Sequence, residues 1–445
     1  MTEPLFPLPE EQARPASAKG QPRVVTANRQ QIEMRLASLD DLLPDDHRAR
    51  LVWAMVQTYD LSAFYAGIEA VEGEAGRPAI DPALLLALWL YATVDGVGSA
   101  RALERLCREH LAYQWLVGGV SVNYHTLADF RVAHEADLDD LLTHSVAALM
   151  HEGLVDLAQT AQDGIRLRAS AGASSFRRAD TLEDCLQQAE QHVQQLKTDG
   201  AGLGAPSARS RPQAARERQA RERLERVQQA LQEVDKLEAQ KARNRESKRK
   251  ARPARASTSD PQARVMKMPD GGFRPAYNGQ LNVDMSSRII VGVDLSTEAD
   301  TRLLVPMLDQ TQARYGRRMD EHYIDGGFRS NAGLTAAAQR GVVIYTPIPH
   351  SYNAASLKKP EEVLPTDSPA VAEWKARMLT AEAKEKYKGR AATVEWANAL
   401  LRQRGLQRLL VRGVRKARAV LLWFVLAHNL MQTLNLRQQR RSAAA

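Results

Sequence analysis

The chain has 445 residues and a formal net charge of +8, and its length is enough for two or three domains of about 100–200 residues each. Two cysteines, Cys107 and Cys185, exclude a disulfide framework and a cysteine-rich metal site. No apolar segment near the start resembles a signal peptide, and the longest apolar run, residues 419–427, is far shorter than the ~20 residues that cross a membrane. We therefore expect a cytoplasmic protein with no membrane partner.

The positive charge is concentrated in two segments. Residues 205–256 contain 16 Lys or Arg against 7 Asp or Glu, and residues 390–441 contain 11 against a single acid, Glu395. The rest of the chain therefore carries a net charge of −11. Clustered Lys and Arg are typical of proteins that bind nucleic acid, although one charged run can equally be a solvated helix face.

The N-terminal part predicts a disordered segment followed by a helical domain. Residues 1–28 are proline-rich and aperiodic, whereas residues 29–156 have helical periodicity. Three helices are predicted within this domain, over 81–96, 99–116 and 124–142. The first has Asp81 as its N-cap and Gly96 at its end. These three helices predict a helix-turn-helix-like bundle. Such a bundle can bind DNA, bind protein or have a structural role, and the sequence pattern leaves all three open.

From residue 157 the pattern changes to strands that alternate with helices. Residues 157–172 predict a strand that carries Asp163, a turn at Gly164 and a second short strand. Further strands are predicted at 276–284, 288–296, 322–327 and 342–348, and helices at 301–315, 330–340 and from 368 onward, including one at 417–436. This order predicts an α/β fold with a mixed sheet flanked by helices, followed by a disordered tail over 437–445.

Residues 178–265 interrupt this pattern with two coiled-coil seams. Their apolar residues are spaced three and four apart and are Leu182, Leu186, Ala189, Val193 and Leu196, then Leu224, Val227, Leu231 and Val234. A loop at 199–212, rich in Gly, Ala, Pro and Ser, lets the two helices fold back on each other. The second helix ends in a basic run at 241–255. We therefore expect a basic coiled-coil hairpin inserted between residues 157–177 and 266–436.

Three carboxylates occupy positions suited to metal binding. Asp163 lies near the end of the first strand, Asp325 ends the fourth strand before two glycines, and Glu395 lies on a helix. If the first and fourth strands are neighbours, the two aspartates lie side by side and a nearby helix could add the glutamate. Three converging carboxylates cannot all stay ionised without a cation, and a pair of Mg²⁺ ions would suit them.

Other interpretations of these carboxylates stay open. Strand-end aspartates more often form turns than bind metals, and Asp284, Asp294 and Asp300 lie on the same sheet, where we expect Asp294 to be structural. The histidines His125, His134 and His428 are expected to pack or to contact DNA, because no second His or Cys lies at metal spacing.

The helix around Glu395 also carries cations. Tyr387 and Arg390 precede it, and Arg402 follows by seven residues, nearly two helical turns, so Glu395 and Arg402 share a face. A glutamate that binds a metal beside a cation that binds phosphate suits a DNA strand that crosses this face. The alternative is that Arg402 is a solvated cation.

These four residues resemble the Tyr–Arg–Glu–Lys signature around the catalytic glutamate of DDE transposases from bacterial insertion sequences. This sequence departs from the signature in three respects: four residues instead of three separate Arg390 from Glu395, Arg402 replaces the usual Lys, and residues 396–398 lack the proline common after the glutamate. The segments AQDGIRLRASA and YIDGGFRSNAGL resemble the strands of the first and second catalytic aspartates. Residues 412–434 resemble the family's C-terminal helix, and 77–119 with 124–131 resemble its N-terminal helical domain.

The resemblance implies an RNase H-like catalytic core in which Asp163, Asp325 and Glu395 bind two Mg²⁺ ions, with Mn²⁺ able to substitute. It also implies that Tyr387 and Arg390 contact DNA together with Arg402. The implied activity is that of an endonuclease and polynucleotidyl transferase. Water cuts the transposon end to leave a 3′ hydroxyl, which then attacks target DNA.

The implied partners are double-stranded DNA, as terminal inverted repeats and target, and further copies of the chain in a homodimer or higher oligomer associated with the nucleoid. Two alternatives remain: a transposase-derived DNA-binding protein without catalysis, and a structural coiled-coil protein.

Overall fold

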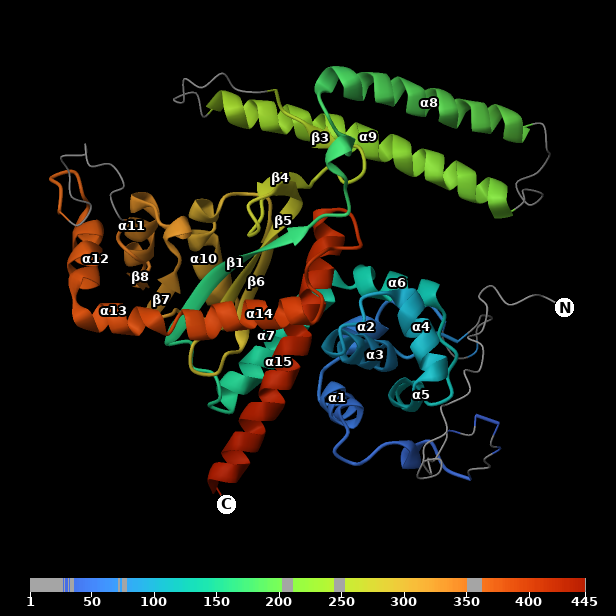
Figure 1. Cartoon of the computed structure of the whole chain (residues 1–445), viewed down its shortest axis with the longest axis horizontal. Helices are drawn as coiled ribbons and strands as arrows, with labels where there is room; N and C mark the ends of the chain where they lie inside the picture. Colours follow the sequence, from blue (N-terminus) through green and yellow to red (C-terminus); the bar gives the residue numbers. More distant parts are fainter. Residues whose placement is uncertain are drawn as a thin grey trace, which may run out of the picture.

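The computed structural model describes residues 27, 29–30, 32, 36–70, 73, 78–201, 211–243, 253–349 and 362–444. Almost all of the predicted disordered N-terminus, most of the 199–212 loop and residues 244–252 of the basic run therefore lie outside the described residues. Figure 1 shows three parts: a helical region, a mixed sheet with its own helices, and a long two-helix hairpin that extends along one side of both.

The helical region begins the described chain. Its elements are η1 (Asp40–Leu42), α1 (Arg48–Val56), α2 (Ser62–Tyr65), α3 (Pro82–Val94), α4 (Ala100–Glu109), α5 (Leu111–Val117), α6 (Tyr124–Ala133) and α7 (Glu135–His151). The α3 helix agrees with the prediction, because the Asp81 side chain accepts a hydrogen bond from the Ala83 amide and Gly96 follows the helix with a φ of +75°.

Two of the predicted helices are each split by a histidine. His110 has extended backbone angles, and its ring accepts a hydrogen bond from the Ala112 amide, so it ends α4 and caps α5. His134 separates α6 from α7, and its ring packs 5.0 Å from Phe64 and 4.8 Å from Phe130. Apolar periodicity alone did not reveal either break, because both halves of each predicted helix bury apolar residues in the same core.

The mixed sheet is centred on two long strands. The strands are β1 (Gln159–Arg168), β4 (Arg264–Lys267), β5 (Phe273–Asp284), β6 (Ile290–Ser296), β7 (Glu321–Ile324) and β8 (Val343–Tyr345). On one side, β5 pairs antiparallel with β4 and β6, and on its other side it pairs antiparallel with β1. The β1 strand pairs parallel with β7, which pairs parallel with β8. The prediction that the first and fourth strands, β1 and β7, are neighbours is thus confirmed.

The predicted turn at Gly164 is wrong, because β1 passes straight through this residue. A side chain at position 164 would begin 2.9 Å from Oδ1 of Asn278, 3.0 Å from Nε2 of Gln280 and 3.1 Å from Oδ1 of Asp300. The glycine therefore makes room for polar side chains that pack against the strand.

Helices cover both faces of the sheet. They are η4 (Asp300–Arg302), α10 (Leu304–Tyr315), η5 (Gly326–Phe328), α11 (Asn331–Gln339), α12 (Pro369–Leu379), α13 (Ala381–Lys388), the π-helical turn η6 (Ala391–Glu395), α14 (Trp396–Gln403) and α15 (Val414–Ala444). The α10 helix contacts one face, where Thr311 bonds Asn282, and α15 contacts the other, where Leu421 approaches Gly279.

The long helix α15 joins the helical region to the sheet. It packs against α3, α6 and α7 on one side and against β6 on the other, and one continuous hydrophobic core includes residues of all these elements. Among the described helices it alone is long and apolar enough to cross a membrane, but 72% of its most apolar window is buried inside the fold, as in the core helix of a globular protein.

The predicted disordered tail over 437–445 is also wrong, because α15 continues to Ala444. Its last turns are tied to the end of α7: Arg437 forms an ion pair with Glu152, and Arg440 donates to the carbonyl oxygen of Glu152.

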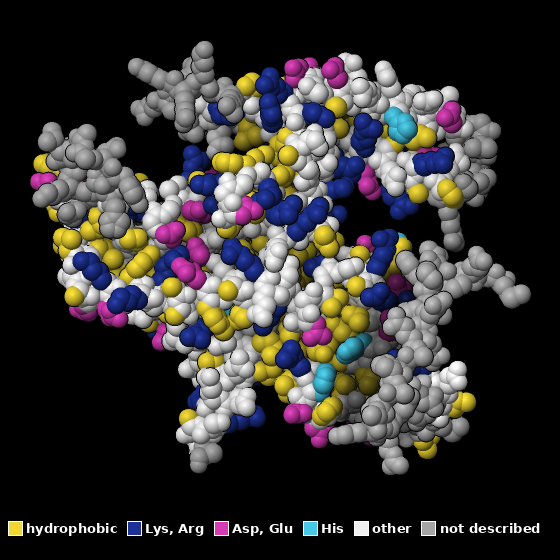
Figure 2. Space-filling view, viewed as in Figure 1, with side chains coloured by type: hydrophobic (Ala, Val, Ile, Leu, Met, Phe, Trp, Pro, Cys, Tyr) yellow, Lys and Arg dark blue, Asp and Glu magenta, His cyan; other side chains and the backbone are white. Residues whose placement is uncertain are grey.

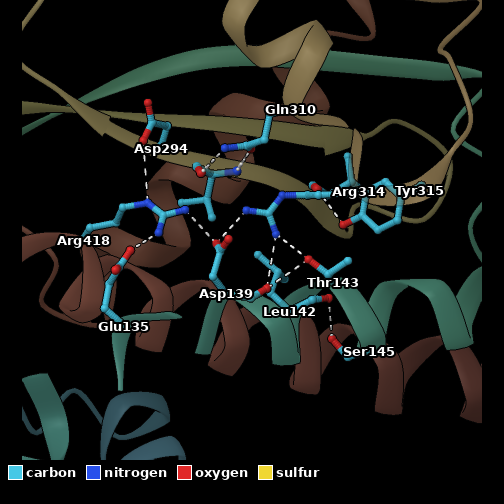
Figure 3. Close-up of polar contacts among 12 residues, drawn as sticks. Glu135, Asp139, Leu142, Thr143, Ser145, Asp294, Gln310, Arg314, Tyr315 and Arg418 are labelled. Atoms are coloured by element: carbon cyan, nitrogen blue, oxygen red, sulfur yellow. Dashed lines mark hydrogen bonds and ion pairs between the residues drawn. The ribbon is translucent and has the colours of Figure 1, made fainter. Parts of the chain in front are cut away.

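An ion-pair network reinforces the contact between the helical region and the sheet (Figure 3). Arg418 of α15 pairs with Glu135 and with Asp139 of α7, and its Nε lies 3.6 Å from Oδ1 of Asp294 on β6. Arg314 of α10 pairs with the same Asp139 at 2.6 Å. Asp294 therefore lies in a packing contact, and the helical region and the sheet form one structural unit.

The insertion is a two-helix hairpin, as predicted. Its helices α8 (Ala179–Ala201) and α9 (Arg211–Arg243) lie side by side (Figure 1), with Leu182, Ala189, Val227 and Val234 of the predicted seams buried. The short turn η2 (Ala173–Ser175) leads into strand β2 (Phe176–Arg177), which pairs with β3 (Ala256–Ser257) to close the base of the hairpin. The sheet resumes at Arg264, within the segment assigned to the insertion.

Candidate active site

The three predicted carboxylates come from three elements that meet at one place. In the parallel pair of β1 and β7, Gln162 lies opposite Ile324. Asp163 is the next residue of β1, and Asp325 is the residue that follows β7. Glu395 ends the π-helical turn, which packs against β1 and β5. Asp163 lies on the face of β1 that α15 covers, and Asp325 and Glu395 are exposed.

Arg390 lies between two of these carboxylates and is itself buried. Its Nη2 lies 3.0 Å from Oδ1 of Asp163, and its Nη1 lies 2.9 Å from Oε1 of Glu395. The exposed fractions of the three side chains are 7% for Arg390, 21% for Asp163 and 54% for Glu395. The guanidinium thus places a positive charge between two of the three carboxylates.

The electrostatic environment of Asp163 reflects this arrangement. Burial raises the pKa of its carboxyl group above the usual value, while the nearby Arg390 and the Gly164 amide act in the opposite direction. The negative charges of Asp325 and Glu395 raise the pKa further. Asp163 is therefore a desolvated carboxylate beside two others, and its ionised form depends on a nearby cation.

The π-helical turn explains how Arg390 reaches Glu395 across four intervening residues. In an α-helix of 3.6 residues per turn, residues five apart point about 140° away from each other. In a π-helix the repeat is i to i+5, so such residues lie on the same side. The turn at Ala391–Glu395 therefore accommodates the one-residue departure from the family signature and preserves the ion pair.

Tyr387 anchors the end of α13 to the sheet edge. Its hydroxyl donates to the carbonyl oxygen of Ile324, the residue before Asp325, at 3.2 Å. Burial raises the pKa of Tyr387, Arg390 lowers it, and the three carboxylates raise it. Tyr387 is thus within electrostatic range of the whole group.

Arg402 does not join this group. Its side chain is partly exposed on α14, and it has no ion pair or side-chain hydrogen bond within the part of the chain that the structure describes. Its predicted contact with DNA stays a prediction.

Asn398 is a site residue that the sequence did not single out. It is 4% exposed, and its Nδ2 donates to Oδ2 of Asp163 at 2.9 Å, so Arg390 and Asn398 each hold one oxygen of this carboxylate. Its Oδ1 is buried without a hydrogen-bond partner among the described residues. The only available signal was its position, one helical turn after Glu395.

A buried polar layer lies on the opposite face of β1. His322 of β7 bonds Thr160 through Nδ1 at 2.7 Å and Gln162 through Nε2 at 3.2 Å, and Gln162 donates to Gln280 of β5. Burial, helped by Arg390, lowers the pKa of His322 to about 3, so the ring is neutral at physiological pH. These hydrogen bonds fix the strands directly behind Asp163.

The competing aspartates have structural partners. Asp284 accepts hydrogen bonds from the side chains of Ser286 and Ser287 in the turn before β6, and Asp300 forms an ion pair with Arg166 at 2.7 Å.

His134 and His428 pack as expected. His428 is buried against Trp396 at 5.7 Å, and burial lowers its pKa to about 4. His134 bonds Asp137, whereas His125 is exposed and contacts only the tilted ring of the adjacent Tyr124 among the described aromatic residues, at 4.0 Å between ring centroids.

The donor set suits a hard divalent cation, because all three groups are carboxylates and Asp163 is desolvated. As the side chains lie, no three His, Cys, Asp or Glu among the described residues converge closely enough to share one ion. Arg390 occupies the space between Asp163 and Glu395 and supplies the positive charge there. Asp163, Asp325 and Glu395 are the residues that would hold such an ion.

Two family models match the chain. The Transposase domain (DUF772) matches residues 37–133, within the helical region, and the Transposase DDE domain matches residues 358–434, which include Tyr387, Arg390, Glu395 and Arg402. No curated protein matches the chain.

Both models describe transposase domains, and each covers one part of the chain. More narrowly, the two matches support a DDE transposase of an insertion sequence, in agreement with the resemblance noted in the sequence. The second match begins after Asp163 and Asp325, so the placement of these two aspartates rests on the sheet geometry alone.

Proposed function

We propose that this protein is a transposase that cleaves DNA at the ends of an insertion sequence and transfers the cut strand to target DNA, with the mixed sheet as an RNase H-like catalytic domain. The strand order supports that fold: β6, β5 and β1 are antiparallel neighbours, and β7 and β8 continue the sheet parallel to β1. The observation that carries the proposal is that the buried guanidinium of Arg390 joins Asp163 and Glu395, with Asp325 beside Asp163 on the neighbouring strand edge.

In this proposal the three carboxylates hold two Mg²⁺ ions, with Mn²⁺ able to substitute, which would activate an attacking oxygen and stabilise the leaving one. Asn398 fixes the orientation of the Asp163 carboxylate, and the polar layer behind β1 prevents the strand from shifting. Arg390, on release from one carboxylate, is close enough to bind a phosphate oxygen of the DNA. Tyr387 holds the helix that carries Arg390 against the end of β7.

The proposed partners follow from this chemistry. They are double-stranded DNA, as terminal inverted repeats and target, and at least one further copy of the chain in the DNA complex. The proposed location is the cytoplasm, in association with the nucleoid.

The test is metal-dependent nicking of a plasmid that carries the DNA flanking the gene on both sides. We expect the purified protein to nick this plasmid with Mg²⁺ or Mn²⁺ and not with EDTA, and we expect Asp163→Ala to abolish nicking. Asp270→Ala is the matched control, because it removes an exposed carboxylate of the same sheet region, paired with Arg274, and should retain activity.

A second readout does not depend on turnover. Mn²⁺ should raise the melting temperature of the wild type and not of Asp163→Ala, because a ligand that binds only the folded state stabilises it. Nicking that persists in Asp163→Ala would contradict the site assignment. Specific binding of the terminal repeats without nicking would instead favour a DNA-binding protein that has lost catalysis.

A further inference from the structure

A run of cations without acidic residues connects α14 to the first turn of α15. Its members are Arg402, Arg404, Arg408, Arg412, Arg415 and Lys416. Within the described residues none of the six has a carboxylate at ion-pair distance, and the last four are exposed. Some exposed cations elsewhere are paired, as Arg274 is with Asp270 and Lys388 with Glu385. The four exposed cations therefore present positive charge that favours an anion, whereas Arg404 is half-buried and lines a different pocket.

This segment is fixed to the strand that carries Asp163. The Leu409 amide donates to the carbonyl oxygen of Arg168 at 2.8 Å, and the Arg168 amide donates to that of Gln407 at 3.0 Å. Arg168 lies five residues after Asp163 on β1, about 17 Å at ~3.3 Å per residue. One turn of B-form DNA is about 34 Å long, so a duplex with its scissile phosphate at Asp163 could also reach this segment.

The end of the segment forms one side of a cleft of about 510 Å³. Arg412, Gly413 and Lys416 line it from the C-terminal side, Arg226 and Gln229 of α9 line it from the hairpin, and α6 borders it from the helical region. Figure 2 shows a hollow between the hairpin and the helical region, with Lys and Arg side chains along its border. We refer to this feature as the cationic cleft.

The charges in the cationic cleft are suited to phosphate. Arg226 and Arg412 line the cleft from the hairpin and from the C-terminal side. Burial lowers the pKa of Arg226, the positive charge of Arg412 lowers it further, and Glu222 raises it. An anion between the two arginines would relieve their repulsion. Glu222 and Glu225 also line the cleft and offset part of this charge. Glu222 is exposed and its ion pair with Arg226 is long, at 3.6 Å, so this pair is weak.

The residues that line the cationic cleft favour double-stranded over single-stranded DNA. No described residue of the lining is aromatic, whereas sites for single strands usually stack bases on aromatic side chains. Cations with Ser and Gly are typical of contacts with the sugar–phosphate backbone of a duplex.

We propose that the cationic cleft binds the backbone of the double-stranded DNA that is cleaved at Asp163, and that the hairpin insertion provides one side of this binding surface. The proposal rests on the proposed function for the identity of the substrate. It assigns a DNA-binding role to the base of the insertion, at Arg226, in addition to any role of the basic run beyond α9.

The experiment measures DNA affinity without metal, so it is independent of catalysis. The variant is Arg412→Gln/Lys416→Gln, and the matched control Arg274→Gln/Lys388→Gln removes two cations that are paired elsewhere on the surface. The probe is a fluorescent duplex of about 40 base pairs from the DNA flanking the gene, titrated in EDTA between about 50 and 300 mM NaCl.

Each lost phosphate contact lowers the slope of log Kd against log salt by about 0.9, so we expect a change near 1.8 for the cleft variant and at least about tenfold weaker binding at the lowest salt. The control should keep the wild-type slope, and both variants should melt like the wild type. Equal slopes for the cleft variant and the control would overturn the proposal.

Two further outcomes are decisive. Weakened binding of a single-stranded probe with unchanged duplex binding would overturn the assignment to duplex DNA. A wild type that binds the duplex through the cationic cleft but never nicks it would contradict the proposed function and leave the cleft assignment intact. Arg226→Gln provides the test from the hairpin side, and we expect a slope change near 0.9 for it.

Discussion

Replacement of Arg390 by Met should destabilise the protein through Asp163. The Met side chain retains the apolar stem and removes the charge that holds the Asp163 and Glu395 carboxylates. Removal of one partner from a buried ion pair costs roughly 3–5 kcal/mol, because the other charge stays buried and unpaired. The exposed Glu395 contributes at most about 1 kcal/mol. Since Asp163 is not completely buried, we expect a loss of about 3 kcal/mol in the free energy of unfolding at neutral pH.

The loss should depend on pH. The pKa of Asp163 is already above its usual value, and loss of the cation raises it further while Asp325 and Glu395 stay nearby. The folded variant therefore binds a proton that the unfolded chain has released, so its stability falls as pH rises from the usual carboxyl pKa to the raised one. The deficit of Arg390→Met relative to wild type should thus be smaller at about pH 5 than at about pH 8.

Urea unfolding followed by tryptophan fluorescence measures both effects. Lys388→Met is the control: it breaks an exposed pair with Glu385, which should cost no more than about 1 kcal/mol at either pH. Asp163→Asn in the Arg390→Met background removes the unpaired charge and should recover more than half of the loss. A loss no larger than that of the control, or one that Asp163→Asn does not recover, would refute the electrostatic role of Arg390.

Three other variants test neighbouring features. Deletion of Ala392, which is exposed in the π-helical turn, should restore a regular helix and the spacing of the family signature. We therefore expect this variant to retain nicking and stability. Loss of nicking in a variant that folds normally would contradict the role assigned to the turn. Asn398→Ala should slow nicking about tenfold or more without weakening DNA binding, because it removes the hydrogen bond to one oxygen of Asp163. An unchanged nicking rate would exclude a positioning role for Asn398. Gly164→Ala should lower the free energy of unfolding by about 1–3 kcal/mol in the same urea assay, since its Cβ would collide with polar side chains, and a neutral result would indicate that those side chains are free to move.

Much of the sheet could be predicted from the sequence, because its strands are long apolar or alternating runs separated by turn residues. Once β1 and β7 were taken as neighbours, Asp163 and Asp325 could be placed side by side, although β1 continues beyond Asp163 to Arg168 and does not end there as predicted. Glu395 could be added because it is the only acid in a long basic segment.

The remaining features depend on contacts that local pattern does not specify. A π-helical turn uses the same residue types as an α-helix, so the 3.6-residue period placed Arg402 beside Glu395 and gave no reason for Arg390 to reach it. The polar residues of β1 and β5 alternate as they would on a solvent-exposed face, yet Gln162 and Gln280 are buried. The partners that make their burial possible come from distant parts of the chain.

The position of α15 has a consequence for the synthesis of this protein. Its apolar residues complete the core of both the helical region and the sheet, but α15 follows all of those elements in the chain. Domains fold as units once all of their parts have been synthesised. While the chain emerges from the ribosome, the earlier elements therefore keep apolar surfaces exposed until α15 is complete. The carboxylates of the site should reach their final arrangement only after α15 has been made. A chain interrupted before α15 would keep every candidate metal ligand but should lack the packing that brings them together.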